Sequence, residues 1–258
     1  MKYLIINADD FGLTPEVSRG ILQTVREGIV TSTTVLINSP HVGELPELLK
    51  TRVGIGLHFN LTWGSPVSSP EEVPSLIDEK GFFHSDPSFL GPEGESVYPR
   101  KSEEIQKELE AQVERFLRLL QKPPTHIDVH KHAHKYPTVL NPLIRVAKKY
   151  RIPVRAINSG MRTVLQENGL VTTDFFMGGA LPEGPYWTKE QLLTTLIQVQ
   201  PGVTEIMCHP GYVPEPIPGM FYNQQREVEL RSFCDPEVQE EIKKQGIQLV
   251  DFSFINRP

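Results

Sequence analysis

The chain has 258 residues, 38% of them hydrophobic, and a formal net charge of -6 at pH 7, which is ordinary for a globular protein with a normal core. Its 26 lysine and arginine residues form no basic stripe, and no apolar stretch approaches the ~20 residues that span a bilayer, so neither a nucleic-acid nor a membrane partner is expected. The absence of a signal-peptide pattern, together with only two cysteines, Cys208 and Cys234, favours a reducing cytoplasm.

Short apolar runs alternate with longer segments of helical period along most of the chain. The predicted strands are, in chain order, Tyr3–Ala8, Thr33–Ile37, Val53–Phe59, Thr125–His130, Pro153–Ile157, Thr172–Met177, Val203–Cys208 and Gln248–Phe252. Helices are predicted to begin at Pro15 and Ser102, and then to cover 138–149, 161–168, 188–199 and 236–245. Thr14 and Pro15 predict an N-cap and a first helical position after the first strand.

Residues 60–101 interrupt this alternation with a stretch that is rich in proline and glycine and has no sustained period. Because the stretch is too long for an ordinary connection, we interpret it as an insertion or lid beside a binding site. The alternative is a meander that only covers the outside of the core. No repeat or linker divides the chain, so residues 1–258 are expected to form a single catalytic domain.

The strand-then-helix order requires an α/β fold with a parallel sheet covered by helices. About eight such units in one domain of this length favour a (β/α) barrel over an open, doubly wound sheet, which is the alternative. In barrels of this kind, functional residues lie at the carboxyl ends of the strands. The search for a site therefore begins there.

Acidic and histidine residues gather at four predicted strand ends. Asp9 and Asp10 follow the first strand, His58 ends the third, a cluster at 130–134 ends the fourth, and His209 follows the strand at 203–208. Five of the eight histidines of the chain lie at three of these ends. Chance placement would scatter them more widely.

Asp10, His58 and His130 would supply a carboxylate and two imidazoles from three strand ends. That donor set is common around Zn²⁺ and other divalent ions, and it leaves positions open for water. His132 would share a face with His130 if the strand continued. Alternatives remain for each: the aspartates could cap or turn the chain, His58 could be structural, and the histidine cluster could be a solvated loop.

Asp9 and Asp10 would point to different sides of an extended backbone, one toward a cation and the other toward the reacting centre. An open-sided ion lowers the pKa of its water, and Asp9 is the candidate base. His209 is the candidate acid for a leaving amine, and the turn at Pro210 and Gly211 could direct backbone N–H groups to an oxyanion. The alternative for His209 is a plain residue at a strand end.

Two further residues could support such a site. Arg155, in the strand predicted at 153–157, could neutralise or orient Asp9, or it could form a structural ion pair. Trp63 is one of several aromatic residues in proposed loops that could hold a sugar ring, although aromatic side chains are also routine packing residues.

Four segments together resemble the YdjC-like carbohydrate deacetylases, which include chitooligosaccharide deacetylases: Asn-Ala-Asp-Asp-Phe-Gly at 7–12, Gly-Leu-His-Phe-Asn-Leu-Thr at 56–62, the stretch 125–134, and Glu-Ile-Met-Cys-His-Pro-Gly at 205–211. The resemblance implies a distorted (β/α) barrel related to polysaccharide deacetylases. It also implies removal of acetyl groups from N-acetylglucosamine units with a divalent ion, usually Mg²⁺, and in several members a homodimer.

Carried across, the resemblance places the metal ligands on Asp10, His58 and His130 and the base on Asp9. His132 lies two residues away and is an alternative third ligand. Lys131 stands between the two histidines, where close relatives often have a third histidine. The resemblance therefore does not define which residues surround the metal ligands.

The sequence therefore predicts a metal-dependent hydrolase that removes acetyl groups from N-acetylated sugars of the chitooligosaccharide type, with Mg²⁺, or alternatively Zn²⁺, as cofactor. A metal hydrolase of another bond is one rival, although a phosphoesterase would bring more cations to the strand ends than Arg155 and Lys131. A non-catalytic carbohydrate-binding protein with a vestigial metal site is the other.

Overall fold

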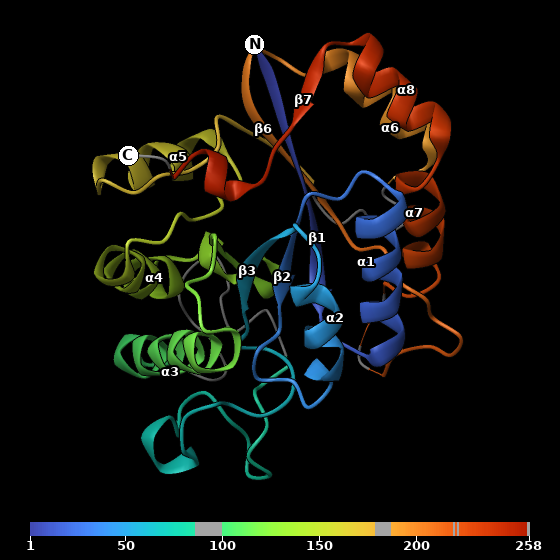
Figure 1. The fold of residues 1–258 in the computed structure, drawn as a ribbon. Coiled ribbons are helices and arrows are strands. Elements are labelled where there is room, and N and C mark those ends of the chain that lie inside the picture. The colour runs from blue at the N-terminus through green and yellow to red at the C-terminus, as the bar shows by residue number, and fades with distance from the viewer. Residues whose placement is uncertain (86–99, 179–186, 219, 221, 257–258) are drawn as a thin grey trace.

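A computed structural model describes residues 1–85, 100–178, 187–218, 220 and 222–256 (Figure 1). A parallel sheet runs through the centre of the molecule, with the strand order β4-β3-β2-β1-β6-β5 and with β7 also paired to β1. The strands are β1 (Lys2–Phe11), β2 (Ser32–Val35), β3 (Gly54–Phe59), β4 (Ile127–Val129), β5 (Phe175–Met177), β6 (Gly202–Cys208) and β7 (Ile247–Leu249). The seven lie close to predicted strands.

The sheet curls into a distorted barrel, as predicted, and irregular backbone connects its two edges. Beyond β4, the amide of Arg155 donates to the carbonyl of Ile127 at 3.0 Å, and the amide of Val154 donates to Val171 at 3.1 Å. Just before β5, the amide of Asp174 donates to Val203 of β6 at 2.9 Å. These bonds take the place of a regular ladder between β4 and β5.

The strand expected at Pro153–Ile157 is therefore wrong, because only an isolated bridge between Ile127 and Val154 forms there. Pro153 has no amide hydrogen for a ladder, and Asn158 already caps the next helix by accepting a hydrogen bond from Met161. The expected strand at 248–252 is also shorter than predicted. It begins one residue earlier, ends at Leu249, and is followed by a 3-10 turn over Phe252–Phe254.

Helices cover the outer face of the curled sheet, and buried apolar residues form one core cluster around it. The helices are α1 (Pro15–Glu27), α2 (Leu45–Leu49), α3 (Ser102–Leu120), α4 (Pro137–Tyr150), α5 (Ser159–Glu167), α6 (Lys189–Gln198), α7 (Gln225–Phe233) and α8 (Pro236–Lys244). Thr14 caps α1 as expected, with its hydroxyl 3.1 Å from the amide of Val17. Helices α2 and α7 were not predicted.

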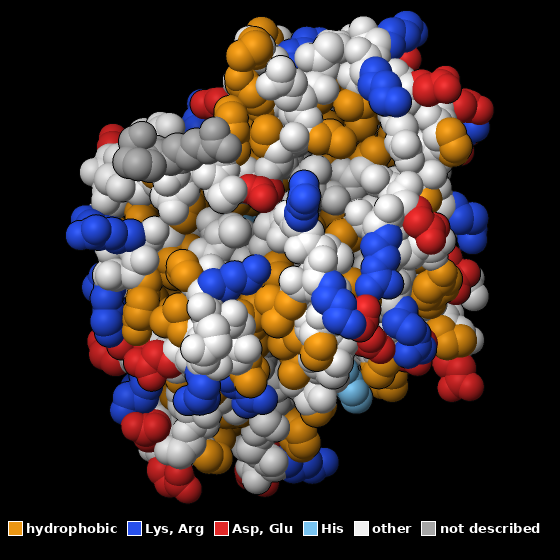
Figure 2. Space-filling view, in the orientation of Figure 1, with side chains coloured by type: hydrophobic (Ala, Val, Ile, Leu, Met, Phe, Trp, Pro, Cys, Tyr) orange, Lys and Arg blue, Asp and Glu red, His pale blue; other side chains and the backbone are white. Residues whose placement is uncertain are grey.

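Charge is mixed on the outside of the molecule. Figure 2 shows Lys and Arg side chains interspersed with Asp and Glu on the face in that view. Among the described helices, none combines the length and the apolar character that crossing a membrane would require.

The described part of the irregular segment, residues 60–85, lies against α3. Buried Glu108 of α3 accepts hydrogen bonds from the amides of Val67 and Ser68, both at 2.9 Å, and Glu104 accepts one from Ser75 at 2.7 Å. These carboxylates satisfy loop amides that would otherwise be buried without partners. Residues 86–99 of the segment expected at 60–101 lie outside the described residues.

Candidate active site

A β-bulge at the end of β1 places both aspartates in one cavity. The pairing of β1 with β2 shifts register between Ala8 and Phe11, and Asp10 has a φ of 72°, a left-handed conformation that is uncommon outside glycine. A bulge of this kind redirects the side chains that follow it. Asp9 and Asp10 are both buried and line the same cavity, so the expectation that they point to opposite sides is wrong.

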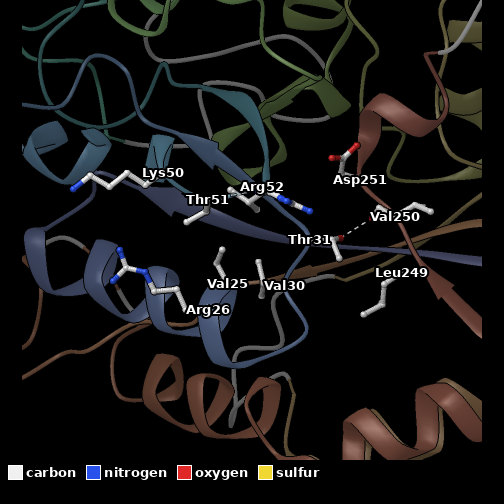
Figure 3. Close-up of a pocket in the computed structure, with 11 residues that line it drawn as sticks. Val25, Arg26, Val30, Thr31, Lys50, Thr51, Arg52, Leu249, Val250 and Asp251 are labelled. Atoms are coloured by element: carbon white, nitrogen blue, oxygen red, sulfur yellow. Dashed lines mark hydrogen bonds between the residues drawn. The ribbon is translucent and has the colours of Figure 1, made fainter. Parts of the chain in front are cut away.

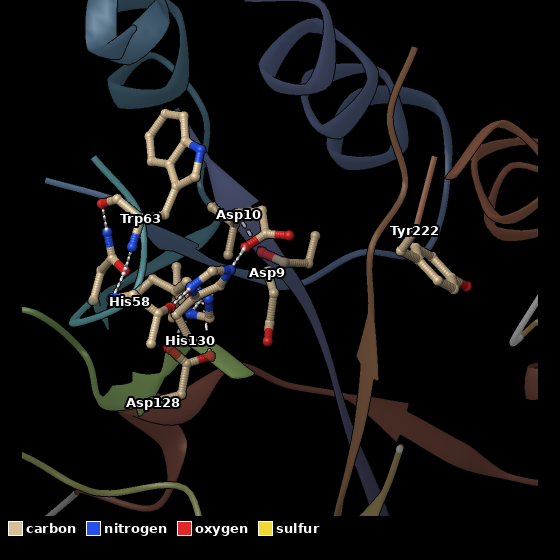
Figure 4. A network of polar contacts seen from close by, with 12 residues as sticks. Asp9, Asp10, His58, Trp63, Asp128, His130 and Tyr222 are labelled. Atoms are coloured by element: carbon tan, nitrogen blue, oxygen red, sulfur yellow. Dashed lines mark hydrogen bonds and ion pairs between the residues drawn. The ribbon is translucent and has the colours of Figure 1, made fainter. Parts of the chain in front are cut away.

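Asp10, His58 and His130 converge, as the spacing of the strand ends predicted (Figure 4). The Oδ1 atom of Asp10 lies 3.2 Å from Nε2 of His58 and 3.9 Å from Nε2 of His130, and the three donor atoms lie within 4.8 Å of one another. The other ring nitrogens are already bonded: Nδ1 of His58 to Asp128 at 2.7 Å, and Nδ1 of His130 to Thr62 at 2.7 Å. Both Nε2 atoms are therefore directed toward Asp10.

This arrangement fits a bound divalent cation. Oδ1 of Asp10 is buried and accepts no hydrogen bond of normal geometry from the described residues, whereas Oδ2 accepts one from Nη2 of Arg226 at 2.6 Å. A ligating histidine commonly donates its far ring N–H to an acceptor, often a carboxylate, and this hydrogen bond orients the ring in metal sites. Two imidazole nitrogens and one carboxylate oxygen form a suitable donor set for Zn²⁺ and similar ions.

In a second group, ligand atoms of Asp9, His58 and Asp128 also lie close enough together to bind one metal ion. The carboxylates of Asp9 and Asp128, however, are already paired with a guanidinium group. Both oxygens of Asp9 accept from Arg155 at 2.7 Å, and Oδ2 of Asp128 lies 2.8 Å from the same guanidinium. Arg155 is fully buried and also pairs with Glu205 at 2.7 Å. We interpret this group as an ion-pair network that holds Asp9 in place.

The network sets the charge of the two candidate proton-transfer groups. Burial alone would raise the pKa of Asp9, but the Arg155 guanidinium outweighs burial and holds it well below its usual range, so Asp9 is ionised at neutral pH. Burial lowers the pKa of His209 to about 4. The His209 ring is therefore neutral at neutral pH before substrate binds.

The pKa values of the two candidate histidine ligands are shifted in opposite directions. Burial would lower the pKa of His58, but the carboxylates of Asp128 and Asp10 outweigh it and raise the pKa to about 10. Burial lowers the pKa of His130 to about 3 despite the nearby Asp10. Without a cation, His58 is therefore the protonated residue among Asp10, His58 and His130. A bound ion would take the place of that proton.

The cavity above these residues has a volume of about 260 Å³. Its lining comes from five regions of the chain and comprises Asp9, Asp10, His58, Val129, His130, Lys131, His132, Lys135, Met207, His209, Met220, Tyr222 and Arg226. Asp9 and His209, the predicted base and acid, are thus brought to the same cavity as the candidate metal ligands. None of the described residues at 60–85 lines it.

The expectation that the turn after His209 offers backbone donors to an oxyanion is wrong. The amide of His209 donates to Glu229 at 2.5 Å, and the amide of Gly211 donates to the carbonyl of Arg226 at 3.2 Å. Pro210 has no amide hydrogen. The donors that the sequence suggested are therefore either absent or already engaged.

His132 does not share a strand face with His130, so that expectation is also wrong. Strand β4 ends at Val129, and Lys131 and His132 adopt left-handed conformations with φ of 55° and 51°. The His132 ring lies edge-on to Phe176, with ring centroids 5.7 Å apart. It lines the cavity, but it does not belong to the group of converging donor atoms.

Trp63 is placed away from the cavity. The side chain is half-buried and packs against the core, and Figure 4 shows its ring pointing away from Asp10 and His58. Its carbonyl accepts a hydrogen bond from Asn60 at 2.6 Å. Among the described residues, Tyr222 does line the cavity, and it donates its hydroxyl hydrogen to Glu229 at 2.5 Å.

Sequence reasoning missed the contribution of α7. Arg226 and Glu229 lie three residues apart on this helix, which places them on the same face, and both are buried. Arg226 donates a hydrogen bond to Asp10. Glu229 accepts hydrogen bonds from the amide of His209 and from the hydroxyl of Tyr222. Charged residues at helical spacing normally indicate a solvated face, so the sequence carried no signal for this inward orientation.

A second hollow, of about 590 Å³, lies at the opposite, amino-terminal end of the strands (Figure 3). There the hydroxyl of Thr31 donates to the carbonyl of Val250 at 2.7 Å. Two of its basic residues, Arg26 and Lys50, are paired with Glu47 at 2.8 and 2.5 Å. It contains none of the converging imidazole donors, so the smaller cavity is the candidate active site.

Comparison with known proteins identifies the family. The model of the YdjC-like protein family matches residues 3–244. The chain belongs to the YdjC-like family. A carbohydrate deacetylase of Geobacillus stearothermophilus is 35% identical over 97% of both chains, and a chitooligosaccharide deacetylase of Yersinia enterocolitica is 32% identical over 98% of both. The predicted family is thereby confirmed.

Solved structures confirm the fold. A protein from Enterococcus faecalis V583, named for cellobiose-phosphate cleavage, superposes with a TM-score of 0.84 at 31% identity over 98% of both chains. The Xyl-CE4 domain of a multidomain xylanase from the hindgut metagenome of Trinervitermes trinervoides gives a TM-score of 0.55 at 10% identity, covering 98% of this chain and 89% of that one. The second likeness concerns the fold alone. The YdjC-like chain is a single-domain α/β protein with a curled parallel sheet.

Proposed function

We propose that this YdjC-like protein is a metal-dependent deacetylase that hydrolyses the N-acetyl groups of chitooligosaccharide-type sugars. Its relatives support the enzyme class, a carbohydrate deacetylase acting on amide bonds. The observation that carries the proposal is the convergence of Asp10, His58 and His130 in one cavity with Asp9 and His209. That set contains a cation site, a base and an acid within reach of one substrate.

Asp10, His58 and His130 would hold the divalent ion through one oxygen and two Nε2 atoms. When bound, such an ion lowers the pKa of water and polarises the acetyl carbonyl. Among the described residues, five buried carboxylates (Asp9, Asp10, Asp128, Glu205 and Glu229) accompany two guanidinium groups (Arg155 and Arg226). Burial raises the pKa of Glu205 and of Glu229 to about 7, so these two are only partly ionised at neutral pH, and His58 is protonated when no cation is bound. A dication would take the place of that proton.

Asp9 accepts a proton from the attacking water, and His209 delivers a proton to the leaving nitrogen. Because the pKa of Asp9 is held far below that of His209, a proton taken up by Asp9 passes favourably to His209, directly or through water. His209 is neutral beforehand and can donate only after this transfer. The water oxygen bonds to the carbonyl carbon, the C–N bond breaks, and acetate and a free amine leave.

The donor set also bears on the identity of the ion. The family resemblance implies Mg²⁺, but Mg²⁺ prefers oxygen ligands, whereas imidazole nitrogens suit Zn²⁺. We therefore expect Zn²⁺ to bind the protein more tightly than Mg²⁺. Single-ion reconstitution of metal-stripped protein, followed by rate measurement with each ion, identifies the ion that supports turnover.

The test of the function is product analysis. Protein supplied with one divalent ion at a time is incubated with diacetylchitobiose and longer acetylated oligomers, and acetate, phosphate and sugar products are measured separately. Acetate release that stops on metal removal is expected. Binding of the sugar without acetate release under every metal condition would favour the carbohydrate-binding alternative, and cleavage of another bond would favour the other hydrolase.

The proposal also includes the cellular location and the oligomeric state of the protein. We expect the protein to work in a reducing cytoplasm and to form a homodimer. Light scattering on the purified chain measures the second directly, and a monomeric mass at working concentration contradicts it.

A further inference from the structure

Arg226 has one hydrogen-bonding group that the described structure leaves unused. The side chain is 2% exposed and lines the candidate active site. Its Nη2 donates to Oδ2 of Asp10 at 2.6 Å, and its Nε donates to the carbonyl of Tyr222 at 3.1 Å. Its Nη1 is buried and has no partner among the described residues. A buried charged donor without a partner is costly, so a ligand atom is the natural partner.

The position of that donor is fixed. A guanidinium is planar and rigid, so the two bonds already made determine the direction of the remaining N–H groups. The Asp10 carboxylate that anchors Nη2 also presents Oδ1 to His58 and His130. The side chain that carries Nη1 therefore lines the same cavity as the candidate cation site.

The reaction also needs a donor at this place. Amide hydrolysis develops negative charge on the acyl oxygen, and preorganised N–H groups that meet this charge are a large source of rate enhancement. The backbone amides of His209 and Gly211, which the sequence suggested for this role, are engaged with Glu229 and Arg226. A fixed guanidinium N–H provides a charged donor in their place.

We propose that Nη1 of Arg226 donates a hydrogen bond to the acyl oxygen of the substrate and then to an oxygen of the acetate product. The inference rests on the proposed deacetylase function and adds a catalytic residue to it. As the water oxygen bonds to the carbonyl carbon, the C=O π pair moves onto the oxygen that faces Nη1. When the C–N bond breaks, that pair returns, the nitrogen leaves with a proton, and acetate remains beside Arg226.

The experiment compares Arg226→Lys with wild type in two assays. Sodium acetate is titrated into metal-loaded protein by calorimetry, and kcat and KM are measured for acetate release from diacetylchitobiose. We expect Arg226→Lys to weaken acetate binding at least tenfold. We also expect it to lower kcat about 10²- to 10³-fold, the effect of losing one oxyanion donor, with a smaller change in KM.

Two controls test whether the effect depends on this contact rather than on net charge or on the position of the metal ion. Lys243→Gln removes an exposed cation of α8 that does not line the cavity, and acetate binding is expected to stay close to wild type. Metal affinity is titrated in every variant, and it should change far less in Arg226→Lys than kcat does. Arg226→Lys keeps the positive charge beside Asp10, and a thermal melt verifies that it folds.

Two results overturn the inference: acetate binding that is unchanged in Arg226→Lys, or losses of metal affinity and kcat by the same factor, which would make Arg226 a positioning residue for Asp10. A different result addresses the proposed function. If wild type binds acetate through Arg226 but releases none from any acetylated sugar, the deacetylase assignment fails while the anion contact stands.

Discussion

Asp9 and Asp10 are neighbours in the chain, yet they have different partners within one cavity. Asp9 is held by Arg155 through both of its oxygens, whereas Asp10 bonds Arg226 through one oxygen and presents the other to His58. The left-handed backbone at Asp10 makes this possible, because an unbroken strand would direct the two side chains to opposite faces. The division of roles between base and ligand follows from that geometry.

Exchanging Asp9 for asparagine tests this division. Asp9→Asn keeps Asp10, His58 and His130 intact, so metal affinity is expected to stay near wild type while kcat falls about 10²- to 10⁴-fold from loss of the base. His58→Ala is the matched variant, and it should lose both bound metal and activity. Metal titration and acetate release measure the two properties; a wild-type rate in Asp9→Asn contradicts the base assignment.

The raised pKa of His58 predicts a proton released on metal binding. Asp128 and Asp10 raise this pKa to about 10, so the metal-free protein holds a proton on His58 throughout the neutral range, and a cation must displace it. Below about pH 10, apparent metal affinity should therefore rise about tenfold per pH unit. Calorimetry in two buffers of different ionisation enthalpy counts the protons. Binding without proton release would show that His58 is not a ligand.

At the scale of elements, α7 is the helix that completes the cavity. It supplies Arg226 to Asp10, and it supplies Glu229, which accepts from the His209 amide and from the hydroxyl of Tyr222. Burial raises the pKa of Glu229 to about 7, although the hydrogen bonds from Tyr222 and His209 oppose that rise. These buried bonds join α7 to the end of β6.

Removing the Tyr222 hydroxyl measures the strength of that attachment. Tyr222→Phe leaves one oxygen of buried Glu229 without its donor, and we expect it to lower the free energy of unfolding by about 1–3 kcal/mol. Tyr212→Phe is the control, because Tyr212 is exposed and its hydroxyl contacts the half-buried Gln23; its effect should stay within about 0.5 kcal/mol. Urea denaturation compares the two, and equal effects contradict the account of α7.

The attachment of residues 60–85 to α3 gives a prediction about their role. Glu108→Ala leaves the amides of Val67 and Ser68 without acceptors and should cost about 1–3 kcal/mol of stability. Because these residues do not line the cavity, the rate of acetate release should be unchanged where the variant is folded. Exposed Glu114→Ala is the control for the helix. A changed rate would favour the lid interpretation over an outer cover.

Across the whole molecule, the sequence predicted the features that follow from local residue patterns, namely the buried strands and the residues at their carboxyl ends. Buried parallel strands are continuous apolar runs, so the β1 and β6 regions could be located, and the carboxyl ends of such strands meet at one edge. That is why Asp10, His58 and His130 could be expected together although they lie far apart in the chain. The identity of the ion does not follow from this pattern.

The sequence could not predict what depends on tertiary contacts. Asp10, Lys131 and His132 adopt left-handed backbone. Aspartate and histidine occur at such positions more often than most non-glycine residues, but that preference is too weak to locate a bulge or a turn from the sequence. Helix α7 has few apolar residues, so its inward-facing Arg226 looks like part of a solvated surface. Pro153 cannot donate a hydrogen bond to a strand ladder, and this signal in the sequence argues against the strand expected at 153–157.

The central claim is that one divalent ion, held by Asp10, His58 and His130, is needed to release acetate. The most direct measurement determines metal content per chain and the rate of acetate release from diacetylchitobiose, side by side, in wild type and His130→Ala. The account predicts one tightly bound ion per wild-type chain, and loss of both ion and activity in the variant. Full acetate release from metal-free wild type, or from His130→Ala with no ion bound, would contradict it.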